Sequence, residues 1–154
     1  MSPSEGSKPY KTILLAGSIA GVLDITAAVA TTLLRSRQPT RMLQSIASGV
    51  LGLNSYNGGL NTAALGLVLH FVIAAGAAAV FYAASRKLTI LVQQAIISGV
   101  LYGIAVYFFM QLVVLPLSAF PHKVSFNLSG LLIGLGVHIF CVGLPISLVV
   151  RRYS

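Results

Sequence analysis

Three ionisable side chains lie inside long apolar segments of this sequence. They are Asp24, His70 and His138, and the chain contains only one other acid, Glu5. A charge at the centre of a bilayer costs about 3 kcal/mol or more, so such residues usually pair or serve a pathway. No Lys or Arg accompanies Asp24 at its place in the apolar segments, which leaves a histidine as its only cationic partner. Either the carboxylate is ionised and an imidazole protonated, or a neutral acid donates a hydrogen bond.

Three kinds of chemistry remain open for these residues. In the first, Asp24 and the histidines form a buried hydrogen-bond network that fixes helix register. In the second, the same groups relay a proton or a cation, although no second membrane acid receives the proton unless subunits assemble into a pore. In the third, the carboxylate and two imidazoles ligate a divalent metal, or His70 and His138 are axial ligands of a haem. Gly66 and Gly134, each four residues before a histidine, would leave room for the macrocycle.

Further polar residues accompany this set. Cys141, about one helical turn after His138, is either a further ligand or a small packing residue. Tyr102, Tyr107 and Gln111 are additional candidates in the third apolar segment. The sequence contains no Ser-His-Asp order, glycine-rich phosphate loop or paired carboxylates. It therefore favours a non-enzymatic protein and leaves enzymatic activity open.

The elements that carry these residues are predicted to be membrane-spanning helices. The chain has 154 residues, of which 56% are hydrophobic and 8% charged, whereas a soluble domain carries about a quarter charged residues. Four apolar segments exceed the roughly 20 residues that a spanning helix needs. They are Ile13–Leu34, Leu60–Ala84, Ala95–Leu117 and Leu128–Val150. Short links between them predict one all-α integral membrane domain over residues 1–154, a four-helix bundle with alternating directions.

The three ionisable residues share a predicted depth and a predicted face. Each lies within about two residues of the centre of its segment, roughly 3 Å or less from the midplane. Small residues flank each at helical spacing, and such stripes pack helices closely in lipid. The stripes comprise Gly17, Gly21, Ala28 and Thr31; Ala63, Gly66, Ala74 and Ala77; Gly134, Cys141 and Pro145; and, in the third segment, Gly99 and Gly103. We therefore expect Asp24, His70 and His138 to face the bundle interior together.

The link between the first two spans contains an amphipathic stretch at about residues 40–53. One face carries Met42, Ile46, Val50 and Leu53, and the other carries Arg41, Gln44, Ser45 and Ser48. This pattern predicts a helix lying at the membrane surface. In the fourth span, Pro145 is predicted to kink the helix.

Basic residues mark the ends of the apolar segments rather than one patch. Lys and Arg number 10 against 2 acids, and their scatter does not indicate nucleic-acid binding. The N-terminus, second link and C-terminus hold more of them than the first and third links do. The positive-inside rule then predicts that both termini are cytoplasmic.

Four stretches carry a resemblance to a known group. "AGSIAGVLDIT" (16–26), "LQSIASGVLG" (43–52), "NTAALGLVLHF" (61–71) and "VVLPLSA" (113–119) resemble small uncharacterised bacterial inner-membrane proteins akin to the YagU family, over most of the chain. The resemblance implies a bacterial cytoplasmic membrane and a family site that includes Asp24 and His70, and it implies no reaction or ligand. It carries over less firmly to His138 than to Asp24 and His70.

The sequence thus predicts a small structural or accessory protein of the lipid bilayer, as a homo-oligomer or within a larger complex. The alternatives are a proton or cation transporter or channel element, and a haem- or metal-binding membrane protein.

Overall fold

Every regular element in the described part of the chain is helical. A computed structural model describes residues 9–124 and 126–153, and no strand occurs within them. Four helical stretches there are long and apolar enough to cross a membrane. They are α1 (Pro9–Leu34), α3 (Gly59–Lys87), the α5–α6 stretch (Ala95–Leu117) and the α7–α8 stretch (Leu128–Arg152). The predicted all-α fold with four spanning helices is confirmed, with bounds that agree to about four residues.

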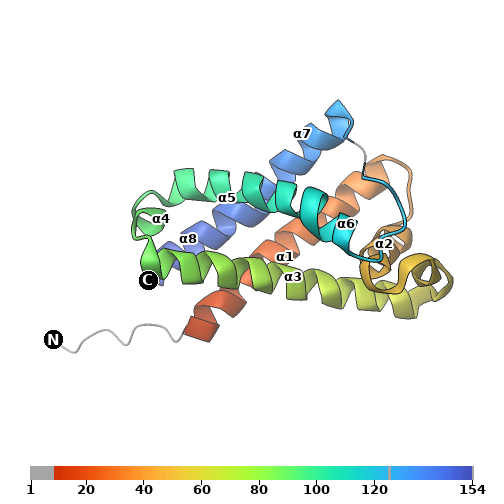
Figure 1. Cartoon of the computed structure of the whole chain (residues 1–154), viewed down its shortest axis with the longest axis horizontal. Helices are drawn as coiled ribbons and strands as arrows, with labels where there is room; N and C mark the ends of the chain where they lie inside the picture. Colours follow the sequence, from red (N-terminus) through yellow and green to blue (C-terminus); the bar gives the residue numbers. More distant parts are fainter. Residues whose placement is uncertain (1–8, 125, 154) are drawn as a thin grey trace.

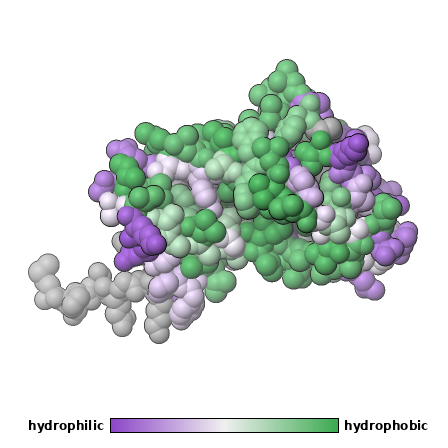
Figure 2. Space-filling view, in the orientation of Figure 1, coloured by the Kyte–Doolittle hydropathy of each residue, from purple (hydrophilic) through white to green (hydrophobic). Residues whose placement is uncertain are grey.

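Successive spans run in opposite directions, as Figure 1 shows. The start of α1, the short helix α4 (Ile90–Gln93) and the end of α8 (Leu144–Arg152) lie at one end, here called the terminal end. Helix α2 (Pro39–Leu51) and the 3-10 helix η1 (Gly52–Asn57) lie at the other, the α2 end. In Figure 2 hydrophobic residues cover the middle of the molecule and hydrophilic ones gather at the two ends. This distribution suits a helical bundle in a bilayer.

Glycines let the spans approach closely in pairs. A Cβ on Gly17 of α1 would lie 2.7 Å from Cα of Ala75 in α3. A Cβ on Gly103 of α5 (Ala95–Phe109) would lie 2.7 Å from Cα of Ile139, in the fourth span. Helices in lipid associate largely through such backbone approach, because burial of apolar surface supplies no driving force there. The small-residue stripes of these spans are therefore contact surfaces.

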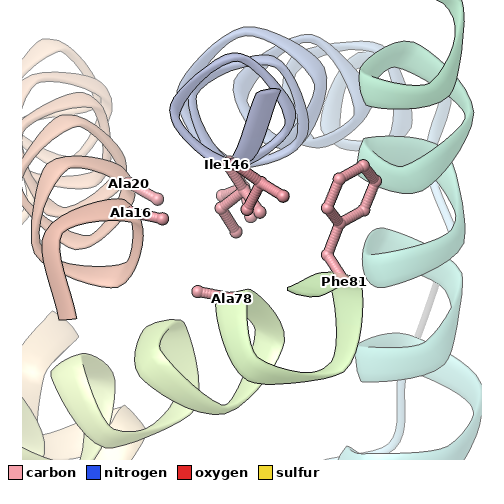
Figure 3. Close-up of a cluster of buried hydrophobic side chains, with 7 residues drawn as sticks. Ala16, Ala20, Ala78, Phe81 and Ile146 are labelled. Carbon is pink, nitrogen blue, oxygen red and sulfur yellow. The ribbon is translucent and has the colours of Figure 1, made fainter. Parts of the chain in front are cut away.

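The closest apolar packing lies toward the terminal end. Figure 3 shows Ala16 and Ala20 of α1, Ala78 and Phe81 of α3, and Ile146 of α8 directed at one another. The Phe81 ring also packs edge-on against Tyr102 of α5, with 5.0 Å between centroids. Apolar side chains of three spans thus pack together in this part of the bundle.

Two spans change from α-helical to π-helical winding shortly before a proline. The turn η2 (Met110–Val114) precedes Pro116 in α6 (Leu115–Leu117), and η3 (His138–Gly143) precedes Pro145 in α8. Proline lacks an N–H, and its ring clashes with the carbonyl four residues earlier. Wider winding before the ring relieves that clash, and π-helical turns recur at functional sites. The irregularity predicted at Pro145 is therefore a π-helical turn, and Pro116 produces a second one.

Helix α2 is present as predicted, and part of its polar face is buried in the protein. Gln44 and Ser48 are buried against α3, whereas the Val50 side chain is 63% exposed. Gln44 donates from Nε2 to the backbone oxygen of Gly59 at 3.0 Å. In lipid an apolar side chain such as Val50 can remain outside, while a polar side chain gains by finding a partner within the protein. The amphipathic pattern predicted a surface helix, and the structure adds that Gln44 and Ser48 are covered by the rest of the protein.

The N-terminus of α7 (Leu128–Val137) provides a first testable prediction. The Asn127 side chain caps it by accepting a hydrogen bond from the N–H of Gly130 at 2.7 Å. We expect Asn127→Ala to lower the free energy of unfolding by about 1 kcal/mol. Detergent-denaturation curves followed by circular dichroism measure this loss. The exposed Asn61→Ala serves as control, and equal curves for the two variants would contradict the cap.

Candidate functional site

A cavity of about 260 Å³ lies where all four spans meet α2. Its polar lining residues are Asp24 of α1, His70 of α3, Gln111 of η2 and His138 of η3. Each of Asp24, His70 and His138 lies about three residues or fewer from the middle of its span, displaced toward the α2 end. Asp24 is the only acid among the described residues. Asp24, His70 and His138 therefore border the same cavity.

Asp24 and His70 form the closest polar pair of this lining. Nδ1 of His70 lies 3.8 Å from Oδ2 of Asp24, and the side chains are 12% and 19% exposed, respectively. The other ring nitrogen, Nε2, lies 2.9 Å from the backbone oxygen of Gly21. Because a carbonyl oxygen only accepts, Nε2 carries the hydrogen of this bond. In neutral His70, Nδ1 therefore carries no hydrogen, and its lone pair faces the carboxylate of Asp24.

His138 is oriented by a similar bond within its own span. Its Nδ1 lies 2.9 Å from the backbone oxygen of Gly134, so Nδ1 carries the hydrogen and Nε2 of the neutral ring is an acceptor. The ring packs edge-on against Tyr107, with 5.3 Å between centroids. No hydrogen bond joins His138 to Asp24 or His70 among the described residues. These three side chains therefore share a cavity without forming one bonded network.

The cavity lining is consequently rich in acceptors and poor in donors. Both imidazoles give their neutral-state N–H groups to backbone carbonyls. Among the described residues, no N–H or O–H donates a hydrogen bond to the carboxylate of Asp24. The only described group beside it that can carry a positive charge is the imidazole of His70, once that ring is protonated. Gln111 alone brings amide N–H donors to the lining. Such a lining favours a proton, a water or another donor-rich species.

The remaining sequence candidates divide between this lining and other surroundings. Gln111 lines the cavity, as noted. Tyr107 is buried beside Gly134 and His138, where it supports the His138 ring. The Tyr102 hydroxyl donates to the backbone oxygen of Ala77 at 2.6 Å and so ties α5 to α3. Cys141 is a half-buried free thiol that does not line the cavity.

Sequence reasoning missed two features of the site. Met42 and Ile46 of α2 line the cavity, although their helix was expected at the membrane surface. The π-helical turns η2 and η3 supply Gln111 and His138 to the lining. The signals available in the sequence were the two prolines that follow these turns. The packing of α2 left no such signal, because an amphipathic pattern does not say which face is covered.

The donor set does not suit a metal ion or a haem. No three His, Cys, Asp or Glu side chains within residues 9–124 and 126–153 are grouped to hold a metal. The glycines expected to make room for a macrocycle have other neighbours. A Cβ on Gly66 would collide with the Leu43 backbone oxygen of α2, and one on Gly134 would collide with the Tyr107 ring. The Nε2 atom of His70, the usual ligand, is already bonded to Gly21.

The fold and composition define the class as an all-helical membrane protein with four spanning helices. The chain matches no protein-family model, no curated protein sequence and no solved structure. Membership of the YagU family and location in a bacterial inner membrane remain predictions.

Proposed function

We propose that this protein is a proton-pathway element of the membrane, with the Asp24–His70 pair as its protonatable site. The observation that carries the proposal is the orientation of His70. Its Nε2–H is given to Gly21, so a lone pair on Nδ1 faces the carboxylate of Asp24 across 3.8 Å. When His70 is neutral and Asp24 is ionised, Nδ1 and the carboxylate are both hydrogen-bond acceptors and have no hydrogen to share. One added proton, on either atom, replaces this opposition with an attraction.

The surroundings support uptake rather than a purely structural pair. A side-chain network that only fixed register would fill its space, because protein interiors are close-packed. Here the pair borders a cavity of about 260 Å³, which is large enough for water. His138 lines the same cavity and is the next titratable group available to a water-carried proton. Transfer of the proton from this pair to the other side of the membrane uses either water in this cavity or a second copy of the chain.

Replacing Asp24 by asparagine tests the proposal. Asparagine keeps the side-chain shape but no longer takes up a proton at this site. We expect purified wild-type protein in liposomes to lower the internal pH when a membrane potential drives protons inward, and a trapped pH-sensitive dye reports this change. Asp24→Asn should lower this flux to that of protein-free liposomes. Cys141→Ser, a change near but outside the cavity, should leave it unchanged.

Either of two results overturns the proposal. One is wild-type flux no greater than that of empty liposomes. The other is undiminished flux through Asp24→Asn in protein whose helicity and elution match the wild type.

The His70–Gly21 hydrogen bond favours a second candidate, a structural role in an accessory membrane protein. This bond joins α3 to α1, and interhelical hydrogen bonds in membranes contribute about 0.6 kcal/mol on average. His70→Gln separates the two roles, because glutamine offers an N–H to Gly21 but does not titrate. For a proton pathway, we expect His70→Gln to lose flux while its unfolding curve stays near that of the wild type. For a structural role alone, His70→Ala should be destabilised and the glutamine variant should behave as wild type in every assay.

A further inference from the structure

A second, apolar space adjoins the polar cavity. It measures about 470 Å³ and lies between α3 and the α5–η2 part of the third span. We call it the α3–α5 groove. Its lining comprises Ile73, Gly76, Ala77, Val80, Tyr102, Ala105, Val106, Phe109, Met110 and Val114. In Figure 1, α3 and α5 run along opposite sides of the view, and Tyr102 ties them together at Ala77.

The groove and the cavity share part of their walls. Ile73, Ala77, Val106 and Met110 line both spaces. Gly76 lies in the groove with nothing within 4 Å of where its Cβ would stand, so the groove is open beside it. Together the two spaces offer a polar compartment for a head and an apolar one for a chain. Binding pockets commonly combine mostly apolar walls with a few converging polar groups.

The polar compartment selects the chemistry of the head. Its side-chain acceptors are the carboxylate of Asp24, Nδ1 of His70, Nε2 of His138 and the amide oxygen of Gln111, and the lining contains no Lys or Arg. A carboxylate or phosphate head would meet like charge and acceptors. A primary ammonium carries a positive charge and three N–H donors, which complement this set.

We propose that the cavity and the α3–α5 groove together bind a single-chain amphiphilic primary amine. Its ammonium group lies beside Asp24 and its alkyl chain occupies the groove. The inference rests on the proposed function in one respect, since the ammonium uses the carboxylate of the pair that takes up the proton. Binding and proton flux are nevertheless separate measurements, so either can fail alone.

Decylammonium is the probe, and decyltrimethylammonium is its matched control. Both are cations with the same chain and both enter detergent micelles, but only the primary amine donates hydrogen bonds. With protein in nonionic micelles and no pH gradient, we expect decylammonium to raise the unfolding temperature by about 2–4 °C relative to its control. Native mass spectrometry should show one decylammonium retained per chain.

Two variants locate the head and the chain. Asp24→Asn should abolish the difference between the two probes. Gly76→Leu should also abolish it by filling the groove, and its new side chain enters open space, so the fold is retained. Gly136→Leu in α7 is the control, because its Cβ also meets nothing within 4 Å and it lies outside both linings.

The possible outcomes separate the two proposals. Equal shifts for the two probes, or a difference between them that survives either Asp24→Asn or Gly76→Leu, would overturn the amine site. If flux still depends on Asp24, the proton pathway stands without it. Selective decylammonium binding without wild-type proton flux would leave the amine site and remove the pathway.

Discussion

Replacing Gly143 by leucine is expected to prevent the chain from reaching its folded state. A Cβ at this position would collide with the backbone oxygen of Gly99 and lie 2.5 Å from the nitrogen of Gly103. Both neighbours are backbone atoms of α5, so no side chain can rotate away. Overpacking against movable neighbours costs typically 1–3 kcal/mol, and separating two helices costs more. The expected result is loss of monodisperse protein in size-exclusion chromatography.

The matched control is the same substitution at Gly136. That glycine is also helical, but a Cβ there meets nothing within 4 Å. Gly136→Leu should elute as the wild type does. Its unfolding temperature should equal that of the wild type or be slightly higher, since leucine favours helix over glycine. Wild-type elution and thermal midpoint for Gly143→Leu would show that the fourth span does not depend on this contact.

Replacing Gly66 by leucine is expected to detach α2 while the four spans remain folded. A Cβ on Gly66 would collide with the backbone oxygen of Leu43 in α2 and lie 2.8 Å from its carbonyl carbon. Helix α2 lies at one end of the bundle and can move without separating two spans. Because Met42 and Ile46 line the cavity, this movement opens the cavity on that side.

Maleimide labelling measures the opening. In a Cys141→Ser background, a cysteine introduced as Ile46→Cys reports on access to the face of α2 that borders the cavity. We expect Gly66→Leu to raise its labelling rate about tenfold or more, since 1–3 kcal/mol of overpacking shifts an opening equilibrium by that order. Gly76→Leu is the control on the same helix, because its side chain enters open space. Equal labelling rates in the two backgrounds would show that Gly66 does not hold α2 in place.

Much of the fold was predictable because hydrophobic length is a strong signal. Spanning helices must satisfy their backbone internally and cross a fixed thickness, so their number and approximate bounds follow from composition. The packing of α2 was not predictable in the same way. An amphipathic helix normally turns its polar face to water. In α2, however, the amide of Gln44 donates a hydrogen bond to the backbone oxygen of Gly59, and the Val50 side chain stays exposed. In a bilayer both arrangements satisfy the same sequence pattern.

The glycines show the same division. Gly17 and Gly21 were expected to form a contact stripe, and Gly17 does approach Ala75 of α3 closely. Gly66 and Gly134 were expected to leave room for a macrocycle, but their space is taken by α2 and by the Tyr107 ring. A glycine in the sequence indicates that something approaches closely. Only the packing of the chain decides what approaches.

The sequence by itself determined that this protein is helical, apolar enough for a membrane, and supplied with one acid and two histidines near the middle of its spans. These properties follow from residue type and spacing, which are local. The tertiary structure alone decided that Asp24 and His70 face each other across 3.8 Å, and that the Gly21 carbonyl takes the N–H group of His70. The Gly21 bond and the Asp24–His70 approach depend on the register of α1 against α3. Helix register in lipid is set by backbone approach and interhelical hydrogen bonds, which no single segment encodes.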